Sequence, residues 1–320
     1  MSAEPAVAAD VKRSRLPDRV TTAVRVFAWL SFIAEVVIVG TGGAVRLTDS
    51  GLGCEWPLCT PGSLYPTPAM GIHSFIEFGN RMMSGVVGIL ALVLLILVWR
   101  LRRSRRDLWW LALVVVLGVL AQAVVGGITV NTRLNAGVVS FHYLASITLV
   151  CVTAAFLARM DIAPGPRVRA VPRWYAILTH LTSFVLVIVV VFGVLTTANG
   201  PHSGDADVIR HGFNATILAH VHAVPAYVLF GLTLVLVIAA SLQRLPVRGW
   251  AIALLCVELV QIAVGLYQAR DNLPALAVGV HMVLAALLAA TMTVLVTRLK
   301  TTAETSLTEP EAVGSALTGR

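Results

Sequence analysis

The stretch GTGGAVRLTDSGLGCEWPLCTPGSLYPTPAMGIHSFIEFGNR, residues 40–81, decides the fold of this chain. It ends one long apolar segment, crosses a loop that holds Cys54 and Cys59, and enters a second apolar segment that carries Glu77. A carboxylate at membrane depth is costly and by default marks a functional site. The functional hypothesis therefore starts from this loop and this acid.

The composition of the whole chain is that of an integral membrane protein. Its residues are 58% hydrophobic and 12% charged, whereas about a quarter of the residues in a soluble domain are charged. A helix needs ~20 apolar residues to cross a bilayer. The sequence predicts an all-α membrane protein with eight transmembrane helices, at residues 23–45, 72–99, 108–130, 137–158, 174–196, 217–241, 249–267 and 276–297.

The positions of Lys and Arg predict the orientation, because these residues accumulate in cytoplasmic loops. Clusters lie at 12–25, 100–106, 159–173 and 298–320, always at the same end of the predicted helices. We expect a multi-pass plasma-membrane protein, surrounded by lipid, with both termini cytoplasmic. The net charge of +8 is thus a topology signal and gives no support to nucleic-acid binding.

An internal repeat divides the chain into two halves. VLAQAVVGGITVNTRLNAGVVSFHYLAS and VELVQIAVGLYQARDNLPALAVGVHMVLAA share a Gln, a Gly four residues later and a His twenty residues after the Gln. These residues are Gln122, Gly126, His142 and Gln261, Gly265, His281. A repeat with an even number of spans has parallel topology, so the sequence predicts two pseudo-symmetric four-helix bundles in parallel repeat. The expected organisation is a disordered tail (1–22), an N-terminal half (23–158), a linker (159–173), a C-terminal half (174–297) and a second disordered tail (298–320).

The same repeat brings Asn80 and His222 to approximately equivalent places, 42 residues before Gln122 and 39 before Gln261. Together with His142 and His281 they form four inward-facing positions on the even-numbered helices. Two imidazoles offered by neighbouring helices suit a porphyrin iron. The ordinary alternative for a membrane histidine is a hydrogen bond to an adjacent helix.

Three buried acids and one cysteine pair need separate interpretations. Glu77 lies one helical turn from Asn80 on the same face, although an ion pair with Arg81 at i+4 is also expected there. Two other intramembrane acids, left as structural or proton-handling candidates, are Glu35 and Glu258. In an oxidising outer loop, Cys54 and Cys59 are expected to form a disulfide.

The strings GGAVRLTDSGLGCEWPLC, IEFGNR, ANGPHSGD, HVHA and GVHM, in this order, resemble the haem A synthase family. The resemblance implies an oxidoreductase that oxidises the C8 methyl of haem O to the formyl group of haem A, with oxygen expected from water. It also implies a haem b held by His222 and His281 in the C-terminal half. In the N-terminal half it assigns Glu77 to catalysis and His142 to the substrate iron.

One residue departs from the family's pattern, because Asn80 stands where a histidine usually completes a Glu-x-x-His-Arg motif. Either His142 alone holds the substrate iron, or His73 approaches from the same face of the helix. We favour the first, since a single ligand eases exchange of a substrate. The implied partners are haem O synthase, cytochrome c oxidase assembly and an unidentified electron acceptor; a homo-oligomer is compatible with the sequence.

Two other functions compete with this one. A di-haem cytochrome b electron carrier explains paired histidines, but it predicts four equivalent ligands and no role for Glu77. A transporter built on parallel repeats explains the pseudo-symmetry, but it predicts Gly/Pro-broken helices at mid-depth. The asymmetry at Asn80 and the clustering of the special residues toward the outer face disfavour both.

Overall fold

A computed structural model describes residues 19–202, 204–205, 208 and 214–303. These residues form eight helices that are long and apolar enough to cross a membrane. The helices are α1 (Thr22–Leu47), α2 (Ile72–Leu97), α3 (Arg106–Asn131), α4 (Ala136–Met160), α5 (Arg173–Ala198), α6 (Ala215–Leu242), α7 (Arg248–Arg270) and α8 (Ala275–Arg298). Each predicted span ends within three residues of one of them, so the predicted fold class is confirmed.

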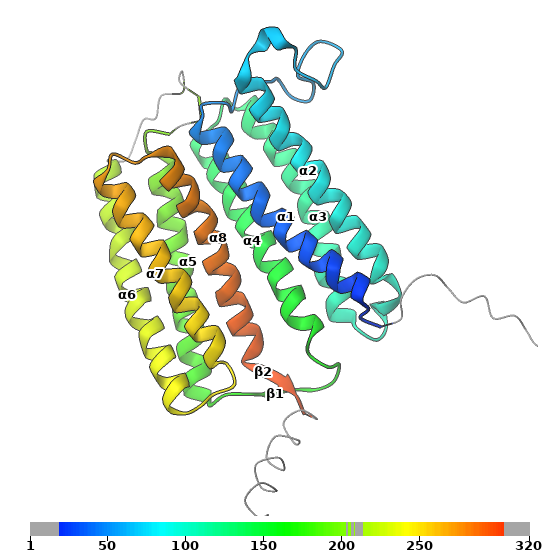
Figure 1. The fold of residues 1–320 in the computed structure, drawn as a ribbon, viewed down its shortest axis with the longest axis vertical. Helices are drawn as coiled ribbons and strands as arrows, with labels where there is room; N and C mark the ends of the chain where they lie inside the picture. The colour runs from blue at the N-terminus through cyan, green and yellow to red at the C-terminus, as the bar shows by residue number, and fades with distance from the viewer. Residues whose placement is uncertain (1–18, 203, 206–207, 209–213, 304–320) are drawn as a thin grey trace, which may run out of the picture.

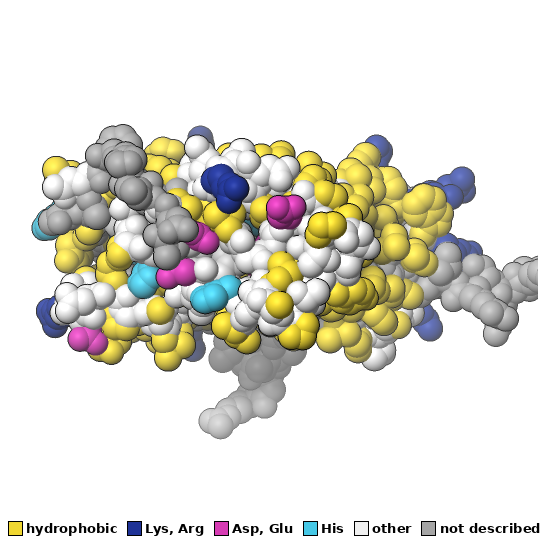
Figure 2. Space-filling view, turned by 90° about the horizontal axis from the view of Figure 1, so that it is seen from above, with side chains coloured by type: hydrophobic (Ala, Val, Ile, Leu, Met, Phe, Trp, Pro, Cys, Tyr) yellow, Lys and Arg dark blue, Asp and Glu magenta, His cyan; other side chains and the backbone are white. Residues whose placement is uncertain are grey.

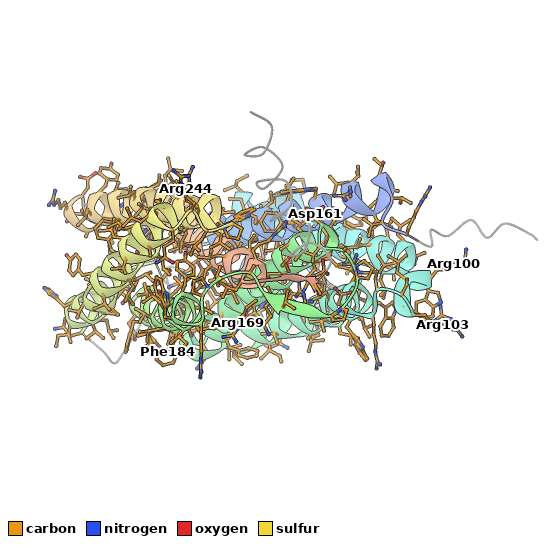
Figure 3. All side chains as sticks on the ribbon, turned by 90° about the horizontal axis from the view of Figure 1, so that it is seen from below. Arg100, Arg103, Asp161, Arg169, Phe184 and Arg244 are labelled. Atoms are coloured by element: carbon orange, nitrogen blue, oxygen red, sulfur yellow. A yellow bond between two sulfur atoms is a disulfide. The ribbon has the colours of Figure 1, made fainter. Side chains whose placement is uncertain are left out.

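The helices run between two chemically different ends (Figure 1). At the end that we call the terminal end, α1 begins and α8 finishes, whereas the long loop between α1 and α2 projects from the opposite end, the loop end. Arginines gather at the terminal end, where Figure 3 labels Arg100, Arg103, Arg169 and Arg244. At the loop end, polar surface with acids and histidines interrupts the hydrophobic flanks (Figure 2).

The packing joins the two halves of the chain through α8. Sequence neighbours pack against each other in both halves, and α1 also packs against α4. Helix α8 contacts α7 and α5 of its own half, and it also contacts α1 and α4 of the other half. The division into two separate pseudo-symmetric bundles therefore remains a prediction, because α8 belongs to both sets of contacts and α4 also packs against α5 of the other half.

Equivalent turns in the two halves have the same unusual backbone. After α3, Arg133 and Leu134 have φ values of 50° and 56°, and after α7, Asn272 and Leu273 have values of 55° and 57°. Non-glycine residues rarely adopt this left-handed region. Since both pairs lie eleven residues after the repeated Gln, the repeat extends from the sequence to the backbone conformation.

Two short strands close the terminal end. The antiparallel strands β1 (Arg167–Arg169) and β2 (Lys300–Thr302) pair with each other. The C-terminal disordered tail expected from residue 298 therefore does not begin there, because backbone pairing with the linker orders Lys300–Thr302. Residues 1–18 and 304–320 of the two expected tails lie outside the described residues.

Candidate functional site

Two histidines face each other inside the C-terminal half. His222 on α6 and His281 on α8 have ring centroids 6.4 Å apart, with an interplanar angle of 81°. Both line a cavity of about 270 Å³. An imidazole nitrogen binds a transition metal at ~2 Å, so two imidazoles on opposite sides of one ion have centroids roughly 6 Å apart. The observed separation fits one iron held between the two rings.

The hydrogen bonds of these rings fit the same role. His222 Nδ1 lies 2.9 Å from the carbonyl oxygen of Val189, and because that oxygen can only accept, Nδ1 carries the proton and Nε2 is left for a metal. Among the described residues, the buried Nδ1 of His281 has no hydrogen-bond partner. The donor set and the spacing together fit a haem iron.

A glycine on the preceding helix faces each imidazole. A Cβ added at Gly193 on α5 would lie 2.9 Å from His222 Cε1, and one at Gly265 on α7 would lie 3.0 Å from His281 Cε1. Real Cβ atoms essentially never approach a neighbour more closely than 3.0 Å. A Cβ at Gly193 would therefore force the ring of His222 to shift, and one at Gly265 would require the ring of His281 to give by a few tenths of an ångström.

The N-terminal half repeats this arrangement with a different set of donors. Asn80 on α2 and His142 on α4 line a cavity of about 130 Å³. A Cβ at Gly126 on α3 would lie 3.4 Å from His142 Cε1, and one at Gly42 on α1 would lie 3.9 Å from Asn80 Oδ1. Each of the four predicted positions is thus opposite a glycine, but the clearance is larger in this half.

The repeated glutamines explain why the Gln-to-His spacing is the same in both halves. Gln122 Nε2 donates to the carbonyl oxygen of His142 at 2.8 Å, and Gln261 Nε2 donates to that of His281 at 3.1 Å. Each glutamine therefore ties the backbone of a histidine to the preceding helix. This role for the glutamines was not predicted, although their equal spacing from the histidines is visible in the sequence.

The side chain of Asn80 is engaged by its own neighbour. Its Oδ1 accepts a hydrogen bond from Thr41 Oγ1 on α1 at 2.7 Å. The buried Nδ1 of His142, by contrast, has no hydrogen-bond partner within the described part of the chain. The N-terminal cavity therefore offers one imidazole where the C-terminal cavity offers two.

Glu77 is buried, but it does not line this cavity. Its Oε2 accepts from the backbone N–H of Cys54 at 2.7 Å, and its Oε1 pairs with Arg81 at 2.5 Å. Arg81 also donates to the carbonyl oxygens of Cys54 and Glu55. The expected i+4 ion pair is therefore present, and it holds the base of the loop as well as the acid.

The loop itself is closed by the predicted disulfide, since Cys54 and Cys59 are bonded with their Cα atoms 4.5 Å apart. His73 belongs to this loop region, with its Nδ1 3.0 Å from Ser50 Oγ. It is not among the residues that line the N-terminal cavity. The structure thus brings Asn80 and His142 together and leaves Glu77 and His73 beneath the loop.

Two charged residues that were not predicted to belong to the site also line the N-terminal cavity. Glu35 was left as a structural or proton-handling candidate, and Arg46 in the last turn of α1 was given no role in the site, yet both line the cavity that also holds Asn80 and His142. Arg46 Nε donates to the carbonyl oxygen of His202 at 2.7 Å. Glu35 lies seven residues before Gly42 and Arg46 lies four residues after it. This helical spacing was the available signal that the three residues share one face of α1.

Known proteins match this chain over its membrane region. A family model described as cytochrome oxidase assembly protein (COX15-CtaA) matches residues 25–296. A heme A synthase of Halalkalibacterium halodurans is 31% identical over 156 residues, which are 47% of this chain and 51% of that protein. A heme A synthase of Bacillus licheniformis is 33% identical over 120 residues, or 37% and 39% of the two chains. The one of Listeria welshimeri is 31% identical over 140 residues, or 43% and 45%. The chain thus aligns with about half the length, or less, of these relatives.

Proposed function

Because this chain belongs to the COX15-CtaA family of cytochrome oxidase assembly proteins, we propose that it is an enzyme of haem A biosynthesis. Its substrate is haem O and its product is haem A, formed by oxidation of the C8 methyl to a formyl group. The oxygen of the formyl group comes from water. The observation that carries this proposal is the unequal pair of sites, with two facing histidines in one half and His142 beside Asn80 in the other.

His222 and His281 would hold a resident haem b. Bound there, haem b supplies one-electron transfer. The chain's own contribution is positional: the Val189 carbonyl sets the tautomer of His222, and Gly193 and Gly265 leave room for both rings. Because the glycines and the imidazole rings are so closely packed, this site suits a group that stays bound.

His142 binds the iron of the substrate haem as a single protein ligand. Asn80 supports this assignment, since an amide is a poor iron ligand and its oxygen is already bonded to Thr41. Single ligation favours exchange, and a substrate must enter and its product must leave. The looser clearance around Gly126 and Gly42 points the same way.

Glu77 acts at the methyl carbon, where it stabilises developing positive charge or accepts a proton. Arg81 and the Cys54 N–H hold its carboxylate in place, one helical turn from Asn80. A carboxylate preorganised in a buried site is a strong electrostatic device. Because Glu77 contacts the Cys54 backbone, the loop and the proposed catalytic acid are mechanically linked.

The orientation follows from the arginines of the terminal end (Figure 3). Since Lys and Arg mark the cytoplasmic side, we place both termini in the cytoplasm and the disulfide loop outside the cell membrane. The functional partners are then haem O synthase upstream, cytochrome c oxidase assembly downstream and an electron acceptor. The N-terminal half is the substrate half, and the C-terminal half is the haem b half.

The alternative, a di-haem electron carrier, is favoured only by the similarity of the two backbones. It is separated from the enzyme by one experiment: co-expression with haem O synthase, purification, and identification of the extracted haems by mass. The enzyme yields haem b together with haem O and haem A. Protein that carries only haem b, in cells that contain haem O, would contradict the proposed function.

A further inference from the structure

We propose that Glu35 is a specificity-determining residue, whose carboxyl group hydrogen-bonds the hydroxyl group that distinguishes haem O from haem B. This inference rests on the proposed function, because it assigns a role within the substrate cavity. Glu35 lies on α1, twelve residues before that helix ends at Leu47 and the disulfide loop begins.

Glu35 is a buried acid whose carboxyl group is not fully satisfied by hydrogen bonds within the described residues. Its residue is 2% exposed, and its Oε1 has no hydrogen-bond partner in the described part of the chain. No ion pair of Glu35 is found among those residues either. Burying a polar group without a partner costs free energy, so a partner is expected from whatever fills the cavity that Glu35 lines.

Its depth separates it from the iron ligand. Glu35 precedes Gly42 by seven residues, which places it ~10 Å closer to the terminal end at 1.5 Å of rise per residue. Arg46 lines the same cavity one turn beyond Gly42, at the loop end. The cavity therefore has a cation at its outer end, an imidazole at the level of Gly126, and an acid at its floor.

The walls between these polar ends are mainly apolar, with Val39, Val87 and Leu149 among the lining residues. A suitable ligand has anionic groups at one edge, an apolar body, and a hydroxyl group toward the other edge. Haem O has this pattern, since its hydroxyl-bearing farnesyl substituent lies on the side of the ring away from the propionates. With the propionates toward Arg46, the hydroxyl side is directed toward Glu35.

The discrimination follows from what haem B lacks. Haem B carries a vinyl group in place of the hydroxyl-bearing substituent, so it offers Glu35 neither a donor nor an acceptor. A carboxyl oxygen accepts a hydrogen bond from a hydroxyl group. A site built around such a bond rejects an analogue without the hydroxyl strongly, because its own buried polar group is then left unsatisfied.

The test compares the affinities for haem O and haem B of purified protein that already carries its resident haem b. Each haem is titrated separately, and the dissociation constants are taken from the absorbance change. We expect wild-type protein to prefer haem O by at least about tenfold. In Glu35→Leu this preference should fall by about tenfold, through weaker binding of haem O alone, whereas the share of the preference that comes from burial of the farnesyl chain should remain.

Two further variants keep the test interpretable. Glu35→Gln retains an amide that can bond a hydroxyl group, so it should keep part of the preference. Thr153→Val removes a buried hydroxyl of α4 that bonds carbonyl oxygens of its own helix and does not line the cavity. This control variant should therefore keep the full preference for haem O. If Glu35→Leu loses its resident haem spectrum, Glu35→Ala replaces it.

The outcomes separate this inference from the function on which it rests. If wild-type protein forms haem A but Glu35→Leu keeps the full wild-type preference for haem O, or loses both haems equally, the assignment of Glu35 is wrong and the proposed function stands. If wild-type protein neither prefers haem O nor converts it, the proposed function itself fails.

Discussion

The two halves of this protein share a scaffold and differ in the chemistry placed on it. In both, a Gln side chain bonds the carbonyl of a His, a glycine faces that His, and a left-handed pair of residues turns the chain between the two helices. The main difference is at the second position, where His222 faces His281 but Asn80 bonds Thr41. At this pair of equivalent positions, one side chain rather than a different backbone thus separates the halves.

The two halves also differ in the distance between each glycine and the side chain that faces it. The glycines of the C-terminal half leave 2.9 and 3.0 Å for an added Cβ, and those of the N-terminal half leave 3.4 and 3.9 Å. Interiors are close-packed, so a difference of this size is felt. The C-terminal half is built to hold two rings firmly, and the N-terminal half tolerates movement at the equivalent positions.

The largest effect is expected from substitution of Glu77, because the C-terminal half has no assigned counterpart of this residue. Glu77→Gln keeps the size of the side chain but removes the negative charge and one of the two acceptor oxygens that bond the Cys54 N–H and Arg81, so haem A formation should fall by about 100-fold or more while haem O still binds. Conversion is measured by extracting the haems. The control is Glu55→Gln, because Glu55 is exposed and only its backbone contacts Arg81; conversion at the wild-type rate by Glu77→Gln would overturn the role.

The next effect tests whether the two halves bind different haems. His222→Ala and His281→Ala should each abolish the low-spin haem b spectrum, because one ligand of the facing pair is lost. His142→Ala should leave that spectrum intact and impair substrate placement. His180→Ala is a matched control on α5 with an exposed side chain. Low-spin haem b that survives in both C-terminal variants would remove the assignment.

A smaller effect is expected from the glycines, and it sharpens the difference in clearance. Gly193→Ala places a Cβ 2.9 Å from the ring of His222, whereas Gly126→Ala places one 3.4 Å from that of His142. Overpacking of this kind costs ~1–3 kcal/mol, so haem b occupancy should fall clearly in the first variant. Substrate binding should change less in the second. Equal losses in the two variants would show that the clearances do not matter.

The smallest effect concerns Asn80 itself. Asn80→Ala removes a hydrogen bond to Thr41 but no strong iron ligand, so activity should fall by only a few-fold, as expected for the ~1 kcal/mol of one hydrogen bond. Asn80→His should make the N-terminal half resemble the C-terminal half, with tighter haem binding and slower release. An Asn80→Ala protein as inactive as Glu77→Gln would show that Asn80 holds the substrate.

The sequence by itself determined the helical fold, its eight spans, the disulfide and the repeat that singles out His142, His222 and His281. These features depend on local signals: the length of apolar runs, two cysteines five residues apart, and equal spacings along the chain. Such signals survive without knowledge of the neighbours, because a membrane helix satisfies its own backbone hydrogen bonds.

Only the tertiary structure decided which helix faces meet. Glu77 and Asn80 are three residues apart, yet Asn80 lines the cavity and Glu77 bonds the loop. Glu35 was one of two acids left as structural or proton-handling candidates, and its place in the cavity depends on the packing of α1 beside α2 and α4. Successive residues of a helix point about 100° apart, so the side chains that share a cavity depend on how each helix is rotated against its neighbours, and no local pattern in this chain specifies that rotation.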